Sequence, residues 1–260
     1  MAGEASSGTF LQGLERGLAV IRAFSADAPA LTLSEVARDV GITPATARRI
    51  LLTLSELGYV RTDGRQFSLT PRVLALGWAY LSSLDLGELA GPYMEELSAA
   101  TRESCSIATL DLPDIVYVAR VPTSRIMTVA LGVGARLPAY PTSMGRVLLA
   151  GLGAVELDVY LSDVQTDQLT PHTVTAPDLL RAAIDQTRTD GYALVDQELE
   201  LGLRSLAAPI HNSRGHIVAA LNVSAHASRS TPDSLRQEVL PHLLHAATQI
   251  TTALKHRGHL

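Results

Sequence analysis

Hydroxyl and guanidinium side chains gather in a short segment near the N-terminus, where they could contact DNA. The candidates are Ser34, Thr43, Pro44, Thr46, Arg48 and Arg49. A guanidinium group can donate two parallel hydrogen bonds to a guanine or a phosphate, and hydroxyl groups bind phosphate oxygens. These residue types suit contact with a nucleic-acid duplex, provided that a rigid element presents them together.

Two short helices that meet at a tight turn would present them. In residues 33–54 the apolar side chains repeat with helical spacing, as Val36, Ala37 and Val40 and then as Ala47, Ile50 and Leu51. Gly41 stands between the two sets, where a sharp turn requires positive φ. The pattern is typical of a helix-turn-helix whose second helix lies in the major groove. The alternative, from this segment alone, is an ordinary antiparallel helix pair.

A predicted β-hairpin follows the helix pair. Residues 59–61 and 66–69 have the composition of short strands, and the turn at 62–65 contains the Asp63–Gly64 dipeptide that favours hairpins. A helix-turn-helix followed directly by a small hairpin is a winged helix. Arg61 and Arg65 would then lie on the wing, near a phosphate or the minor groove. The alternative for these two arginines is that they are solvated turn residues.

Charge supports the DNA interpretation locally. The chain as a whole is acidic, with a formal net charge of −5, whereas a general nucleic-acid coat would be strongly basic. Residues 41–72, however, contain five arginines against Glu56 and Asp63, a local charge of +3. This small number of phosphate contacts per protomer is too few for tight, selective binding. We therefore infer a homodimer that places two helices on half-sites roughly 34 Å apart.

Composition narrows the class of protein. The 260 residues, 47% hydrophobic and 18% charged, indicate a folded protein with more than one domain or one large domain. Aromatic residues are scarce, at 4%, which argues against a single-strand binder that stacks bases. A single cysteine, the absence of a signal-like start and the absence of a long apolar run predict a cytoplasmic protein outside the membrane.

The remaining pattern predicts an α+β protein. Helices are expected at 11–24, 72–84, 89–101, 144–152, 155–161, 176–189 and 232–255, and strands at 104–110, 115–121, 126–131, 191–195, 206–211 and 216–224, with a loop at 132–141. Thr175 is expected to cap the helix at 176–189. The many apolar residues around Trp78 indicate a linker helix that also packs on another protomer. The expected domains are a winged helix-turn-helix at 10–71, a linker helix at 72–86 and a sensor-type domain at 87–257.

The sequence resembles the IclR-type bacterial transcriptional regulators over nearly its whole length. The matching segments are LERGLAVIRAF at 14–24, the helix-turn-helix, LGYV at 57–60, LPAYPTSMGRVLLA at 137–150 and ELGLRSLAAPI at 200–210. Within the family it is most similar to the β-ketoadipate-pathway subgroup, which controls catabolism of protocatechuate and 4-hydroxybenzoate. The resemblance implies a GAF-like effector-binding domain, dimers that can pair into tetramers, and a small carboxylate or aromatic acid as effector.

The resemblance also implies an effector site. Carried over to matching positions, its residues are Ala135, Pro141, Asp196, Leu203, Ser205, Asn222 and Ser224. Ser143 and Met144 join them because a helix beginning there would offer free N–H groups and a partial positive charge to a carboxylate. Asn222 and Ser224 would share one strand face. Further carboxylate partners are Arg120, Arg136 and Arg204, with structural ion pairs as the alternative for each.

Other candidate sites carry little weight. His242 and His245 have a spacing compatible with a metal, but solvated helix histidines are the preferred interpretation. Cys105 is interpreted as a buried strand residue, and the acidic run Asp196, Glu198 and Glu200 as a solvated loop. The sequence thus predicts no catalytic residue, no metal and no cofactor. The rival functions are an enzyme that acts on a small aromatic acid and an architectural DNA-binding protein without an effector.

Overall fold

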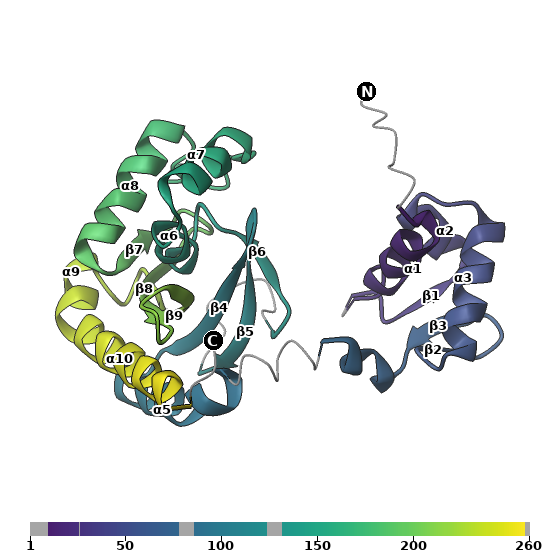
Figure 1. The fold of residues 1–260 in the computed structure, drawn as a ribbon, viewed down its shortest axis with the longest axis horizontal. Helices are drawn as coiled ribbons and strands as arrows, with labels where there is room; N and C mark the ends of the chain where they lie inside the picture. Colours follow the sequence, from purple (N-terminus) through teal and green to yellow (C-terminus); the bar gives the residue numbers. More distant parts are fainter. Residues whose placement is uncertain (1–9, 26, 78–85, 124–131, 258–260) are drawn as a thin grey trace. The chain divides into compact units, whose positions relative to one another are not determined.

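The computed structural model describes residues 10–25, 27–77, 86–123 and 132–257 (Figure 1). The chain divides into two compact units, Met1–Tyr80 and Leu81–Leu260. The expected strand at 126–131, Trp78 and most of the expected linker helix lie outside the described residues. Residues 74–77, at the start of that expected helix, are helical, and Leu74 and Leu76 there are exposed.

The first unit is a small helical domain with a three-stranded sheet. Its elements are α1 (Gln12–Arg22), β1 (Ala30–Thr32), α2 (Leu33–Val40), α3 (Pro44–Glu56), β2 (Val60–Thr62), β3 (Gln66–Leu69) and η1 (Pro71–Val73). The strand order is β1-β3-β2, with both pairs antiparallel. Val36 and Ala37 of α2 and Ala47 and Leu51 of α3 are buried together in one core. This arrangement confirms the predicted winged helix-turn-helix.

One element of this unit was not predicted, and one prediction is correct only in part. The sequence did not indicate β1, in which Leu31 alone is buried, because three residues cannot show a recognisable alternation. The sequence predicts that Leu14, Leu18, Ile21 and Phe24 form the apolar face of the first helix. Phe24 and Ile21 do pack in the core, but Leu14 and Leu18 are exposed and Val20 is fully buried. Of the two residues that the sequence offers as the cap of this helix, Thr32 and Ser34, Thr32 takes the position. It forms a capping box in which its N–H donates to Glu35 Oε2 at 2.7 Å.

The second unit is built on one antiparallel sheet of the order β6-β5-β4-β9-β8-β7. Its strands are β4 (Ser104–Asp111), β5 (Asp114–Val121), β6 (Arg136–Pro138), β7 (Ala193–Asp196), β8 (Leu203–His211) and β9 (Ile217–His226). Its helical elements are α5 (Leu86–Thr101), α6 (Ser143–Ala150), α7 (Ala154–Asp163), α8 (Pro177–Asp190), α9 (Pro232–Ser234), the π-helical turn η2 (Leu235–Val239) and α10 (Leu240–Arg257).

Helices cover both faces of this sheet, so the unit has two cores. One core joins α5 and α10 to the sheet, and the other joins α6, α7 and α8 to the opposite face (Figure 1). β9 takes part in both, because successive side chains of a strand point to opposite faces. Leu221 and Val223 belong to the core under α5 and α10, whereas Ala220 belongs to the core under α6. Asn222 and Ser224, two and four residues beyond Ala220, therefore face α6.

Three details of the second unit depart from the prediction. A short strand, β6, lies within the expected loop at 132–141, because its three residues pair with β5. Ala176, rather than Thr175, is the N-cap residue of α8. The last helix is interrupted by η2 instead of running unbroken from 232. No helix among the described residues is both long enough and apolar enough to cross a bilayer.

Candidate functional site

The N-terminus of α3 begins with two threonines that bond to each other. Thr43 is the N-cap residue: its Oγ1 accepts from the Thr46 N–H at 3.2 Å, and the two hydroxyl oxygens lie 2.9 Å apart. Pro44 occupies the first turn, where the missing N–H leaves no bond unmade. Thr43 and Pro44 are exposed and Thr46 is half-buried. The start of α3 is therefore rigid and accessible.

The exposed face of α3 carries Arg48 and Arg49. Ala47 and Leu51 are fully buried against α2 and hold this helix in place, so the two arginines point to solvent. Ser34, on α2, is exposed as well. The structure thus places these candidate side chains on the surface.

The wing is a tight turn closed by one carboxylate. Asp63 Oδ1 accepts from the N–H groups of Arg65, at 2.9 Å, and Gln66, at 2.7 Å, and Gly64 has a φ of +96°. These bonds from the Gln66 and Arg65 backbone lower the pKa of Asp63, so the carboxylate stays ionised and the turn stays closed. Arg61 and Arg65 flank the turn and are exposed.

In the second unit, α6 begins against its own preceding loop. The Thr142 hydroxyl caps the helix by accepting from the Gly145 N–H at 3.0 Å. A Cβ on Gly145 would lie 2.0 Å from the Ala139 carbonyl oxygen, so only glycine permits this close approach. Because the Gly145 amide is used by the cap, the N–H groups of Ser143 and Met144 are the first-turn amides left for a ligand.

A small cavity lies between the N-terminus of α6 and the sheet. Its volume is about 20 Å³, and it is lined by Tyr117, Pro141, Thr142, Ser143, Met144, Val195, Leu199, Leu203, Ser205, Asn222 and Ser224. Ser205 and Ser224 are direct cross-strand partners on β8 and β9. The cavity therefore brings together seven of the nine predicted effector residues, from three separate parts of the chain.

Two polar atoms at this cavity are buried without a hydrogen-bond partner among the described residues. They are Ser143 Oγ and Asn222 Oδ1. The Asn222 amide is oriented so that Nδ2 donates to Ser224 Oγ at 3.1 Å, which leaves Oδ1 free to accept. An orphaned buried polar atom costs free energy, so two of them beside one cavity indicate a site that a polar ligand completes.

The two other predicted effector residues lie outside the cavity lining. Ala135 packs against the core under α6. The Asp196 carboxylate accepts from Arg204 at 2.7 and 2.9 Å, and this hydrogen bonding from Arg204 lowers the pKa of Asp196. Arg204 and Asp196 are cross-strand partners on β8 and β7, so Arg204 is a structural arginine.

Of the two remaining arginine candidates, one is held in ion pairs and the other is not. Arg136 is paired with Asp111 and Asp114. Arg120 donates to Ser106 Oγ at 3.3 Å and has no acidic partner among the described residues. Because Ser106 is the cross-strand partner of both Arg120 and Asn222, all three share the sheet face that carries the cavity. Arg120 is thus the one of the three arginine candidates that forms no ion pair with a described carboxylate.

Besides Thr142, which caps α6, three lining residues were not indicated by the sequence. Tyr117, Val195 and Leu199 have the ordinary composition of strand and loop positions, and only the three-dimensional packing brings them to the cavity. Burial raises the pKa of Tyr117 to about 12, so its hydroxyl remains protonated at neutral pH.

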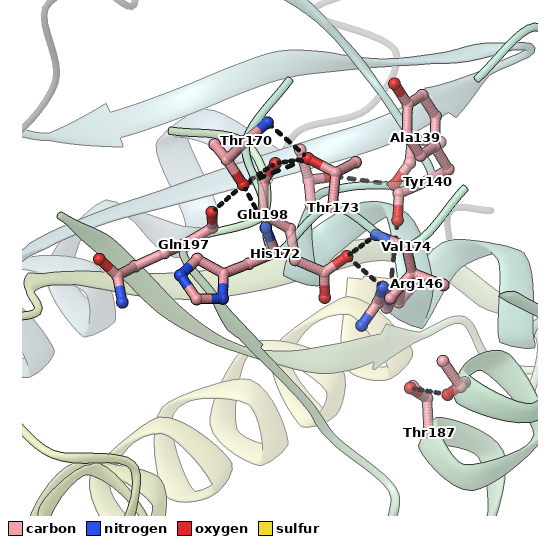
Figure 2. A network of polar contacts seen from close by, with 12 residues as sticks. Ala139, Tyr140, Arg146, Thr170, His172, Thr173, Val174, Thr187, Gln197 and Glu198 are labelled. Atoms are coloured by element: carbon pink, nitrogen blue, oxygen red, sulfur yellow. Dashed lines mark hydrogen bonds and ion pairs between the residues drawn. The ribbon is translucent and has the colours of Figure 1, made fainter. Parts of the chain in front are cut away.

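A buried ion pair lies near this cavity and corrects the interpretation of the acidic run. Glu198, expected in a solvated loop, is buried and accepts from Arg146 Nη2 at 2.6 Å (Figure 2). The Arg146 Nε–H also donates to the Tyr140 carbonyl at 3.3 Å. Arg146 lies on α6, one turn beyond Ser143, so the pair connects the helix at the cavity with the loop between β7 and β8.

A larger groove, of about 630 Å³, lies between α7 and the turn that joins β4 to β5. Its lining is mostly apolar but includes the carboxylates of Glu156 and Asp163, and also that of Asp114, which is paired with Arg136. Negative charge at the groove disfavours an anionic ligand. The smaller cavity, with its hydroxyl groups and helix N-terminus, is therefore the better carboxylate site.

The weaker candidates are ordinary structural residues. Cys105 is fully buried, its thiol donates to the Met94 carbonyl, and burial raises its pKa to about 12. His242 and His245 are exposed on α10. Among the described residues no cluster of three or more metal-ligating side chains is found.

Comparison with known proteins identifies the family. Residues 13–64 match the IclR helix-turn-helix domain, and residues 78–252 match the family described as bacterial transcriptional regulator IclR C-terminal. The chain is 46% identical over 242 residues to the Pca regulon regulatory protein of Pseudomonas putida, covering 93% of the chain and 83% of that protein. It is 37% identical to the p-hydroxybenzoate hydroxylase transcriptional activator of Acinetobacter baylyi, covering 93% and 91%.

Solved structures agree with this result. A transcriptional regulator from Rhodococcus sp. RHA1 superimposes with a TM-score of 0.83 at 55% identity, covering 94% of the chain and 98% of that structure. An IclR homologue from Microbacterium hydrocarbonoxydans, solved with 4-hydroxybenzoate, has a TM-score of 0.83 at 26% identity, covering 94% and 99%. The relatives are regulators, which leaves the enzyme alternative without support. The chain belongs to the IclR family of bacterial transcriptional regulators.

Proposed function

We propose that this regulator binds operator DNA as a cytoplasmic homodimer and changes that binding when a small hydroxylated aromatic acid enters the cavity at α6. The genes it controls would serve the catabolism of such acids. The observation that carries the proposal is the pair of orphaned polar atoms, Ser143 Oγ and Asn222 Oδ1, beside one cavity.

The two orphaned atoms require different hydrogen-bonding groups on the ligand. The Ser143 hydroxyl and the first-turn amides of α6 are donors, which suit a carboxylate. Asn222 Oδ1 is an acceptor and requires a donor, which a bare carboxylate does not have. A hydroxybenzoate supplies both groups on one ring. One relative was solved with 4-hydroxybenzoate, and another is a regulator of p-hydroxybenzoate hydroxylase.

The size of the cavity supports a coupled conformational change. A volume of about 20 Å³ holds roughly one water molecule, whereas ligand sites usually measure about 300 Å³ or more. Binding therefore requires the lining side chains to move. A ligand that fits only the expanded state shifts the population toward it, and a difference between the states at the operator-binding helices makes that shift a signal.

The dimer proposal is supported by exposed apolar side chains on one helix. Leu14 and Leu18 lie one turn apart on α1 and are 62% and 48% exposed, next to the exposed Phe10 and Leu11. An apolar stripe of this kind on an operator-binding unit suits contact with a second copy. We expect Leu14→Glu to shift the sedimentation mass toward the monomer, and an unchanged mass would refute this dimer face. A dimer of dimers would appear in the same experiment as a sedimentation mass of four chains.

The DNA proposal is tested with single arginine variants. We expect Arg48→Ala or Arg49→Ala to weaken binding to the DNA upstream of its gene by about 1–3 kcal/mol, as measured by fluorescence anisotropy. The melting temperature should not change, because both side chains are exposed. Arg236→Ala, an exposed arginine of the second unit, is the control. Wild-type affinity in both α3 variants would overturn the assignment.

A further inference from the structure

One wall of the cavity is the loop between β7 and β8, and contacts with other parts of the unit hold this loop in place. Val195, Leu199 and Leu203, at the ends and in the middle of the loop between β7 and β8, line one side, and the N-terminus of α6 lines another. An acid larger than the present space must move either individual side chains or the loop itself. Which of these can move decides the size of ligand that the site accepts.

The side chain of Glu198, which is not among the residues that line the cavity, anchors this loop. Its Oε2 accepts from Arg146 Nη2 at 2.6 Å and from the Val174 N–H at 3.1 Å (Figure 2). The Arg146 and Glu198 side chains are 7% and 8% exposed. A carboxylate and a guanidinium that are buried together resist separation, because each would be left as an unpaired buried charge.

The backbone of the loop is anchored as well. The Thr173 hydroxyl donates to the Glu198 carbonyl at 2.6 Å, and the Thr170 hydroxyl donates to the Gln197 carbonyl at 2.6 Å (Figure 2). Gln197 has a φ of +59°, a left-handed conformation that a glutamine adopts only when its surroundings hold it. Its side-chain oxygen accepts from the Gly202 N–H at 3.0 Å, which closes the loop.

We propose that the Arg146–Glu198 ion pair fixes the 196–202 loop as a rigid wall and thereby limits the effector to acids with a single ring. The inference rests on the proposed effector function. With the loop held, the cavity enlarges only by rotation of side chains such as Leu199 and Met144, which makes room for one ring. A fused second ring needs the loop to move outward, which breaks the ion pair. Arg146 and Glu198 are positioning residues that do not touch the ligand.

The test compares a one-ring with a two-ring acid on the full-length protein. The probes are 4-hydroxybenzoate and 6-hydroxy-2-naphthoate, with affinities measured by titration calorimetry for wild type, Glu198→Gln and Arg146→Met. We expect the wild type to prefer the smaller acid at least 100-fold and each variant to reduce that ratio at least tenfold. Asp158→Asn, which removes the exposed Arg181–Asp158 ion pair on α7 and α8, should keep the wild-type ratio. Folded variants that retain the wild-type ratio would overturn the proposal.

A second measurement does not depend on a ligand. In hydrogen exchange, the amides of Gln197 and Leu203, which donate to Leu203 O and Glu200 O, should exchange at least tenfold faster in Glu198→Gln than in wild type. Unchanged protection would refute the fixed wall. If wild type binds neither acid, the effector proposal fails, while hydrogen exchange still decides whether the ion pair fixes the loop. If Glu198→Gln does not fold, Arg146→Met removes the same ion pair at its other partner, and both measurements apply to it.

Discussion

Replacing Asn222 by leucine should make the protein more stable and less able to bind its effector. Asn222 is 4% exposed, and its Oδ1 has no partner among the described residues. An orphaned buried acceptor costs about 1–3 kcal/mol, whereas the bond from Nδ2 to Ser224 Oγ contributes about 1 kcal/mol. Leucine has a similar size, removes the first cost and forfeits the second contribution. The net change is a gain of about 1 kcal/mol.

The assay is thermal unfolding of the ligand-free protein, followed by titration with 4-hydroxybenzoate. For a unit of this size, about 1 kcal/mol raises the melting temperature by about 2–4 °C. Loss of one hydrogen bond to the ligand, about 1.4 kcal/mol, weakens binding about tenfold. A variant that melts lower than wild type, or that binds the acid with unchanged affinity, would refute the reasoning.

A matched control is available on the same strand pair. Asn212, in the turn between β8 and β9, is also buried, but its Oδ1 accepts from the N–H groups of Arg214 and His216, both at 3.0 Å. Asn212→Leu removes both bonds and leaves their donors unpaired. We expect it to destabilise the protein by about 2–3 kcal/mol. The same substitution would thus have opposite signs at a satisfied and at an orphaned asparagine.

Two further predictions concern stability. Gly145→Ala should destabilise by about 3 kcal/mol in chemical denaturation, because its Cβ would lie 2.0 Å from the Ala139 carbonyl oxygen. Gly17→Ala, inside α1 with open space around it, should stabilise by about 0.5–1 kcal/mol, and equal effects would contradict the packing argument. Burial, and then the charge of Lys255, lower the pKa of His211, so the unfolded chain binds more protons below about pH 6.5 and stability falls as the pH decreases through that range. His211→Gln should therefore lose less stability than wild type between pH 7.5 and 5.5, and parallel pH profiles would count against this cause.

The winged helix could be predicted because its signals are local. Gly41 has a φ of +69° at the turn between α2 and α3, and Asp63 closes the wing within four residues. Each of these features is fixed by neighbours in the sequence. β1 could not be predicted in the same way, because it becomes a strand only by pairing with β3, more than thirty residues later.

The effector cavity was predictable in part. The alternation of Asn222 and Ser224 follows from strand geometry, and Ser143 follows from the helix start. Asp196 looked available for a ligand because its partner, Arg204, is found only through the register of β7 against β8. Glu198 was expected to be solvated because its ion-pair partner, Arg146, lies 52 residues away in the sequence, and nothing near Glu198 indicates the pair. Long-range pairs of this kind leave no trace in local composition.

The cations of the operator-binding unit have a consequence for how its affinity can be adjusted. Every basic residue before residue 80 is an arginine, and the one lysine of the chain, Lys255, is exposed at the end of α10 in the other unit. Guanidinium groups stay protonated up to about pH 12, and they are not substrates for lysine acetylation. Enzymatic acylation and cellular acidity therefore leave the positive charge offered to phosphates unchanged. Adjustment of operator affinity is therefore expected through the conformation or the abundance of the protein, and not through the charge of these side chains.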